Sequence, residues 1–278
     1  MISYQSLAWS ILSIFGWTCQ AAAAGWVIDQ AEKGGSDAGK QQIMLQANQM
    51  KTVVLGPDGK PESAFIMDLN TETFSQVNYP EGSYMTANVQ EYAQKMEGAM
   101  KQATKTMEDA MKNMSPEQRK AMERAMGSRM PKAGAGPEAC PERKLEIRKT
   151  DQQATIAGYP AVNYEVVVDG KTQTELWIAK GITVSKELDP QKLERMMNEF
   201  SKAVPLCGSV LDRRAGASRD QAWKLVSEGY PVRTVDRGGS GTTMEVIKAE
   251  SRSIPPLEFQ PPANFTRKTL KETMKHEP

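Results

Sequence analysis

The chain has a single histidine, His276, in a polar stretch close to its C-terminal end. Ser-His and Cys-His catalysis need an imidazole beside the nucleophile, and zinc sites use imidazoles or several thiolates. The 34 acidic residues show no spacing that places two carboxylates across a cleft for acid and base work. We therefore expect no catalytic residues, no metal site and no cofactor. An unrecognised hydrolase is the enzymatic alternative.

An excess of charge of one sign is also missing. Lysine and arginine total 35 against 34 aspartate and glutamate residues, so the formal net charge is +1. A near-neutral chain lacks the basic surface that binds nucleic acid or anionic lipid. The sequence GGSG at 238–241 has no lysine of a phosphate-binding loop, so we expect a turn there. We therefore expect no nucleic-acid partner. Partners should be recognised through shape and apolar contact.

The most apolar run is short and lies at the N-terminal end, at residues 7–17. About 11 residues are too few to span a bilayer as a mature anchor. Small residues follow at 22–24, as they do before a signal-peptidase cleavage site, although the preceding segment has no lysine or arginine. We predict a signal peptide at 1–24 and export to the periplasm. The mature protein is not expected to be an integral membrane protein.

Cysteine is scarce, with three in the whole chain. Cys19 could accept a lipid, but the residues before it fit a lipoprotein signal poorly. Cys140 and Cys207 remain after export, and an even pair in an oxidising compartment favours a disulfide. Two buried free thiols are the alternative. The disulfide would close a loop of roughly 66 residues, which the chain-entropy model values at about 4 kcal/mol.

The first third of the mature chain predicts a meander of antiparallel strands. Short alternating segments are separated by turn residues such as the Pro-Asp-Gly-Lys at 57–60. Six or so strands at this spacing favour an antiparallel sheet over parallel units with crossover helices. The clearest segments are residues 25–31, 41–47, 50–56, 63–69 and 73–79.

The pattern changes to helix at Asn88, a suitable N-cap with Glu91 three residues later. This helix is expected to run to about residue 113. A second begins at Ser115, where Pro116 occupies the first helical position, and the predicted helical insert covers residues 88–127. Glycine, alanine and proline then predict a flexible linker at 128–141.

Strand patterns return after the linker. Asp169-Gly170 marks a hairpin, and Asp189-Pro190 opens a helix with apolar residues at helical spacing. Residues 220–226 could be a helix or a strand. The fold class is therefore α+β: a curved antiparallel sheet with a mid-chain helical insertion, in a single domain at 25–265 followed by a polar tail at 266–278. Further strands are expected at 144–150, 154–159, 161–180, 182–188, 228–237 and 242–254.

Four strings carry a family resemblance: IAGYPAVNYEV at 156–166, ELWIAK at 175–180, GYPVRT at 229–234 and FQPPANF at 259–265. With the methionine-rich insert, they resemble an uncharacterised bacterial periplasmic family, a domain of unknown function with the fold of the lipoprotein carrier LolA and its receptor LolB. The resemblance implies a strongly curved, incomplete β-barrel whose open side is covered by helices around an apolar cavity. In the carrier, that cavity takes acyl chains. The longer insert, the linker and the tail depart from the carrier.

Methionine is abundant in the chain, with 17 residues, whereas histidine and cysteine are scarce. At 100° per residue, five of those in the first predicted helix lie within an arc of about 60°. They are Met96, Met100, Met107, Met111 and Met114.

Three interpretations of this methionine face remain open. It could be ordinary core, a flexible apolar cover over a ligand cavity, or a thioether site for Cu(I). Copper is the weakest because Met107 and Met114 lie about 10 Å apart along the helix and no histidine or cysteine is near. We expect a non-enzymatic binding protein that sequesters or carries a lipid, an acyl group or a lipidated protein. An envelope protein-protein interaction module is the alternative.

Cys140→Ser tests the predicted disulfide. If Cys140 and Cys207 are joined, the variant should melt at a lower temperature under non-reducing conditions, because the unfolded chain regains the entropy of the open loop. Differential scanning calorimetry of both proteins measures this, and unchanged melting would count against the bond.

Overall fold

The computed structural model describes residues 24–33, 39–112, 114–115, 144–203, 220, 224–225, 227–239 and 241–273. The predicted signal peptide up to residue 23, the second helix after residue 115, the linker and all three cysteines lie outside the described residues.

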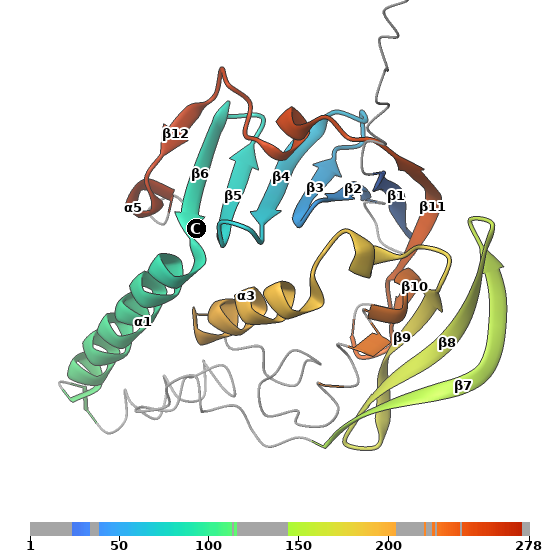
Figure 1. Ribbon diagram of the computed structural model, residues 1–278. Helices are drawn as coiled ribbons and strands as arrows, with labels where there is room; N and C mark the ends of the chain where they lie inside the picture. The colour runs from blue at the N-terminus through green and yellow to red at the C-terminus, as the bar shows by residue number, and fades with distance from the viewer. Residues whose placement is uncertain are drawn as a thin grey trace, which may run out of the picture.

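The described chain is built around one large, open and curved sheet (Figure 1). Its twelve strands are ordered β12-β6-β5-β4-β3-β2-β1-β11-β10-β9-β8-β7. All neighbouring pairs are antiparallel except β12 and β6. The strands are β1 Gly25–Lys33, β2 Lys40–Gln46, β3 Gln49–Leu55, β4 Pro61–Asp68, β5 Thr73–Asn78, β6 Ser83–Asn88, β7 Leu145–Ile156, β8 Tyr159–Val168, β9 Lys171–Ala179, β10 Tyr230–Asp236, β11 Thr243–Arg252 and β12 Thr266–Lys268.

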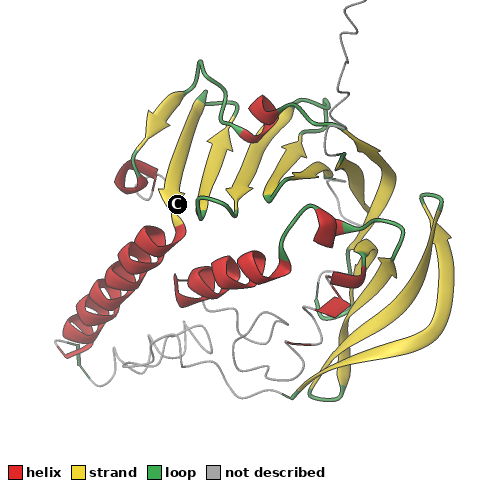
Figure 2. Ribbon diagram, viewed as in Figure 1, coloured by secondary structure: helices red, strands yellow, loops and turns green. Residues whose placement is uncertain are grey.

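Few helices accompany the sheet (Figure 2). Those whose bounds lie within the described residues are α1 Val89–Lys112, α3 Pro190–Ala203 and the short α5 Leu270–Thr273, with 3₁₀ turns η3 Val184–Lys186 and η5 Pro256–Phe259. The α3 helix lies on the concave side of the sheet, and α1 leaves the end of β6 (Figure 1). The predicted α+β class with a curved, mostly antiparallel sheet is confirmed. None of the helices in the described chain is long and apolar enough to cross a membrane.

The sheet consists of two meanders that meet at β1 and β11. Strands β1 to β6 follow one another in space as they do in sequence, and so do β7 to β11. Asp169 and Gly170 both have positive φ, 51° and 79°, which fits the tight hairpin predicted between β8 and β9. Ala157 and Gly158 turn β7 into β8 in the same way.

Two strand predictions were wrong in detail. Residues 182–188 form no strand but a segment centred on the turn η3, and Ile182, Val184 and Leu188 of this segment are buried in the core. This segment is tied to the β2–β3 turn, since the N–H of Asn48 donates to the carbonyl of Glu187 at 2.6 Å. Residues 144–150 and 154–159 belong mostly to one continuous strand, β7, with an irregularity in its pairing where we expected a break.

Alternation of side chains gives the sheet two apolar faces. The inner face, toward α3, carries Ile28 and Leu45, while their neighbours Val27 and Met44 lie on the outer face. The inner cluster also contains residues of the helices, such as Met196 of α3. The outer cluster is completed by residues from the C-terminal part of the chain.

The outer face of β1 to β6 is covered by residues 253–265, which we call the outer strap. The strap connects β11, beside β1, to β12, beside β6, and so crosses this half of the sheet (Figure 1). Ile254 exchanges two hydrogen bonds with the side-chain amide of Gln46, at 2.8 and 3.1 Å. Farther along, Phe259 is buried and Phe265 meets the ring of Tyr79 edge-on at 5.5 Å.

Phe259→Ala should lower the free energy of unfolding by about 3–5 kcal/mol, because it leaves a cavity beneath the strap. Leu257→Ala is the matched control, since Leu257 lies two residues away but is 76% exposed, and its effect should stay within about 0.5 kcal/mol. Urea denaturation of the three proteins measures both values. Similar small effects at the two positions would contradict a structural role for the strap.

Candidate binding site on the inner face

An aromatic group joins the helices to the inner face. Phe74 of β5 packs against Tyr92 of α1 and Phe200 of α3, each with ring centroids 5.0 Å apart. Phe65 of β4 completes the group, 5.7 Å from Phe74. Such pairs contribute about 0.5–1.5 kcal/mol each beyond the apolar area that they bury. Four separate elements therefore meet at one apolar point on the concave side.

Among the α1 side chains that the structure describes, the buried ones lie in the first two turns. Asn88 caps it, as predicted, by accepting a hydrogen bond from the N–H of Gln90 at 2.9 Å. Val89 and Ala93 are buried. From residue 98 onward, every α1 side chain that the structure describes is exposed. We call residues 96–112, which follow these turns, the extending part of α1.

The predicted methionine face lies on this extending part. Met96 is half-buried, whereas the side chains of Met100, Met107 and Met111 lie outside the described residues. Met114 is half-buried in a bend beyond the end of α1 at Lys112. Whether these five residues act as core, cover or copper ligands stays a prediction.

The α3 helix is fixed at its N-terminal end. The carboxylate of Asp189 caps it by accepting from the N–H of Gln191 at 2.9 Å. Asn48 and Asn70, at the ends of the β2–β3 and β4–β5 hairpins, hold this end to the sheet: Asn48 accepts from the N–H of Asp189 at 2.8 Å and Asn70 from Lys192 at 2.9 Å. At the other end, contact with the strands is through apolar side chains such as Phe200.

Much of the inner face remains partly open. Trp26 of β1 and Tyr159 of β8 touch edge-on with centroids 6.3 Å apart, and both are only partly buried. In the described chain, eighteen hydrophobic residues of the inner cluster are buried and twelve are partly buried, so about two fifths of the cluster has surface left to cover. The twelve are Trp26, Ile43, Met50, Phe65, Tyr92, Ala154, Tyr159, Leu193, Phe200, Tyr230, Ala249 and Leu270.

A short polar chain crosses the inner face between the two halves of the sheet. The hydroxyl of Tyr230 donates to Oε1 of Gln30 at 3.3 Å, and Nε2 of Gln30 donates to Oε1 of Gln41 at the same distance. Burial of its hydroxyl end raises the pKa of Tyr230. These groups supply the polar positions of an otherwise apolar surface.

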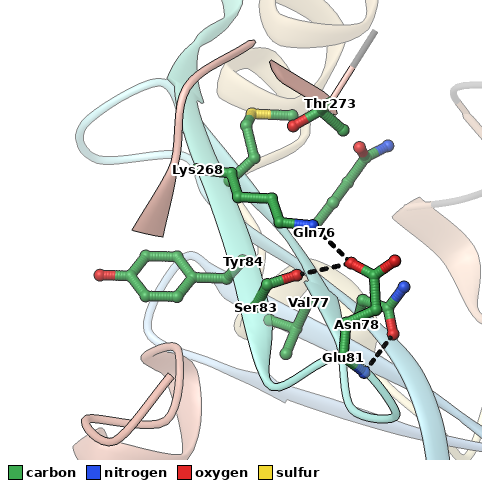
Figure 3. Close-up of a pocket in the computed structure, with 9 residues that line it drawn as sticks. Gln76, Val77, Asn78, Glu81, Ser83, Tyr84, Lys268 and Thr273 are labelled. Atoms are coloured by element: carbon green, nitrogen blue, oxygen red, sulfur yellow. Dashed lines mark hydrogen bonds and ion pairs between the residues drawn. The ribbon is translucent and has the colours of Figure 1, made fainter. Parts of the chain in front are cut away.

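A smaller cavity of about 240 Å³ lies at the other end of the sheet, where β12 and α5 meet β5 and β6 (Figure 3). Lys268 of β12 donates to Oε2 of Glu81 at 2.6 Å, and the buried Ser83 donates to the same oxygen at 3.0 Å. Met85 and Gln76 line the cavity as well. We call this cavity the edge pocket.

The sheet, its partly open inner face and the covering helices define a sheet-based domain of α+β class. The chain belongs to the family described as "Domain of unknown function (DUF4412)", whose pattern matches residues 82–265. No curated protein matches the chain in sequence.

Similar solved structures include an uncharacterized conserved protein from Thermus thermophilus, 7% identical over 89% of this chain and 91% of that one, with a TM-score of 0.43. PNGF-II is 12% identical over 91% of this chain and 32% of its own length, with a TM-score of 0.39. A chain of the Pseudomonas aeruginosa MucA/MucB complex is 8% identical over 88% of this chain and 58% of that one, with a TM-score of 0.36. All three TM-scores lie below 0.5, and none of these likenesses carries a functional argument. None of these three solved structures is described as a LolA-like protein.

The family match and the folded unit have different boundaries. The match begins at Gly82, in the turn before β6, and ends at Phe265, just before β12. Strands β1 to β5 therefore precede it, although β1 pairs with β11 along its whole length. The strap, which lies within the match, packs on strands that lie outside it. The family pattern thus covers only part of one continuous sheet.

Tyr230→Phe should change how stability depends on alkaline pH. As the pH rises above about 10, tyrosine ionises in the unfolded chain while the raised pKa keeps Tyr230 protonated in the fold. The free energy of unfolding then falls by up to about 1.4 kcal/mol per pH unit, a loss that the variant lacks. Urea denaturation between pH 9 and pH 11 compares the slopes. Equal slopes for the two proteins would exclude this effect.

Proposed function

We propose that the protein is an exported, non-enzymatic binding protein that holds an apolar ligand against the inner face of its sheet. The ligand would be a lipid, an acyl group or the acyl chain of a lipidated protein. The observation that carries the proposal is the set of twelve partly buried hydrophobic residues around the inner cluster. The apolar N-terminal segment and the resemblance to the LolA and LolB fold support the periplasm as its location.

The free-energy balance favours a chain-like ligand. Each methylene group moved from water to an apolar surface contributes about 0.8 kcal/mol, so ten contribute about 8 kcal/mol. Association takes at least about 4 kcal/mol of this through lost translational and rotational freedom. An acyl chain that covers only part of the inner face would still bind, and shorter ligands would be released.

The proposed cover consists of α3 and the extending part of α1. Because α3 is hydrogen-bonded to the sheet at Asp189 and Lys192, it can tilt about that end while Phe200 gives way to a ligand. The methionines predicted on α1 suit a surface that adapts to different chains, since thioether side chains are flexible and polarizable. Binding then requires repacking of side chains but no covalent step.

Trp26 offers a direct test because it lies on the inner face. A brominated fatty acid should quench tryptophan fluorescence saturably, with a dissociation constant of roughly micromolar size. Trp26→Phe should reduce the quenching, and Phe65→Asp should weaken binding at least tenfold by placing a carboxylate in the aromatic group. Leu257→Ala, an exposed position on the outer strap, should bind like the parent.

Failure of the brominated fatty acid to quench the parent protein, together with no lipid co-purifying from the native host in native mass spectrometry, would overturn the proposal. Quenching that persists unchanged in Phe65→Asp would place the ligand elsewhere and would overturn the inner-face assignment.

A further inference from the structure

The last strand of the sheet is attached differently from the others. β12 has three residues and pairs in parallel with residues 83–85 of β6, whereas every other pair is antiparallel. Its first N–H, that of Thr266, donates to the carbonyl of Gly82 at 2.9 Å. The α5 helix that follows has four residues and no buried side chain. A segment this short buries little surface, so it gains little stability from packing.

The side-chain contacts of this segment are also weak. The ion pair of Lys268 with Glu81 is partly exposed, at 31% and 51% of the two side chains, and such pairs contribute about 1 kcal/mol or less. Leu270 packs against the inner cluster but is only partly buried. Residues 266–273, which we call the edge segment, are joined to the sheet through a short ladder, a partly exposed ion pair and a partly buried apolar contact.

The residues that the edge segment covers are more deeply buried than the residues of the segment itself. The edge of β6 presents backbone donors and acceptors, and the buried side chains of Ser83 and Met85 lie beside the edge pocket (Figure 3). Lys268 donates to a carboxylate oxygen of Glu81 that also accepts a hydrogen bond from Ser83. A strand edge with a pocket and a fixed charge is the arrangement that recognises extended peptides, with backbone pairing for affinity and pockets for selectivity.

The opposite edge of the sheet is protected in another way. β7 is long, but its pairing is interrupted between Lys149 and Gln153, and charged side chains such as Arg148 and Asp151 are exposed along it. Irregular pairing and charges on an edge strand discourage the addition of another strand. At β6, the protection comes instead from pairing with the edge segment.

We propose that the β6 edge and the residues before and within β5 and β6 that line the edge pocket form a docking site for an extended segment of a partner protein, and that the edge segment covers this site until the partner displaces it. A basic residue in the incoming segment would replace the contact that Lys268 makes with Glu81. Leu270 lies two residues after Lys268, which adds an apolar residue at that spacing. The partner segment therefore carries the pattern basic, any residue, apolar.

Two other occupants fit the structure less well. A second copy of the chain would have to donate its own edge segment, but Phe265, one residue before β12, is packed on Tyr79 of its own sheet. A small molecule would find about 240 Å³, below the usual 300–1,000 Å³ of ligand pockets, with Lys268 and Thr273 of the edge segment forming one wall. A peptide uses both the pocket and the backbone edge.

The test uses the full chain and a fluorescent peptide with the sequence of residues 266–273, TRKTLKET. In the parent, the tethered segment competes at an effective concentration of about millimolar, so the peptide should bind weakly. Lys268→Glu places two carboxylates together and releases the segment, and the peptide should then bind at least tenfold more tightly in fluorescence anisotropy. Adding Glu81→Lys restores an opposite pair within the chain and should return binding to the weak level.

Two control peptides define the recognition. A peptide carrying Lys268→Glu, and another carrying Leu270→Ser, should each bind the Lys268→Glu protein at least tenfold more weakly than TRKTLKET. Hydrogen exchange provides a second measurement on the parent protein: the amides of residues 266–268 should exchange faster than those shared by β5 and β6. Equal peptide affinity for the parent, the single and the double variant, or equal exchange in the two places, would overturn the proposal.

Discussion

The pairing of β1 with β11 is the contact on which the rest of the structure depends. Nine residue pairs join the beginning of the described sheet to a strand more than 200 residues later, and they turn two meanders into one surface. The register shifts between Asp29 and Gln30, where an extra residue enters β11. Such bulges bend a strand and increase its twist. This bulge therefore adds to the curvature that gives the sheet an inner face, at the place where its two halves meet.

This pairing also explains why the family pattern is not a folding unit. A fragment covering residues 82–265 would contain β11 without its partner β1 and the strap without the outer face beneath it. Both would expose apolar side chains and unpaired backbone groups, which are costly to leave unsatisfied. The recurring sequence features of the family thus lie in the half that includes the helices, and the remaining strands complete the same sheet.

Much of the fold could be predicted because its signals are local. Alternation located most strands, Asp169-Gly170 located a hairpin, and Asp189-Pro190 located the start of α3. The turn η3 was mistaken for a strand because Ile182 and Val184 alternate as strand residues do, although tertiary contacts at Asn48 hold them in a turn. β12 carries no apolar pattern, since Thr266 and Arg267 are exposed, so only its pairing with β6 identifies it.

The candidate site was less predictable for the same reason. The methionine spacing on α1 is a local pattern and was easily found, but its side chains lie largely outside the described residues. The aromatic group of Phe65, Phe74, Tyr92 and Phe200 comes from four separate elements, and no spacing in the sequence links them. A contact between distant segments has no periodicity of its own.

The two faces of the sheet differ in how they can move. The strap that covers the outer face contains four prolines, at 255, 256, 261 and 262, which have no N–H to donate to a strand ladder. It is held instead by Gln46 and by buried aromatic rings, which leave the outer face closed. The inner face is covered by helices, of which α3 is hydrogen-bonded to the hairpins of the sheet at Asp189 and Lys192. Because packed sheets deform little, any opening must occur between these helices and the inner face, where apolar side chains already remain partly uncovered.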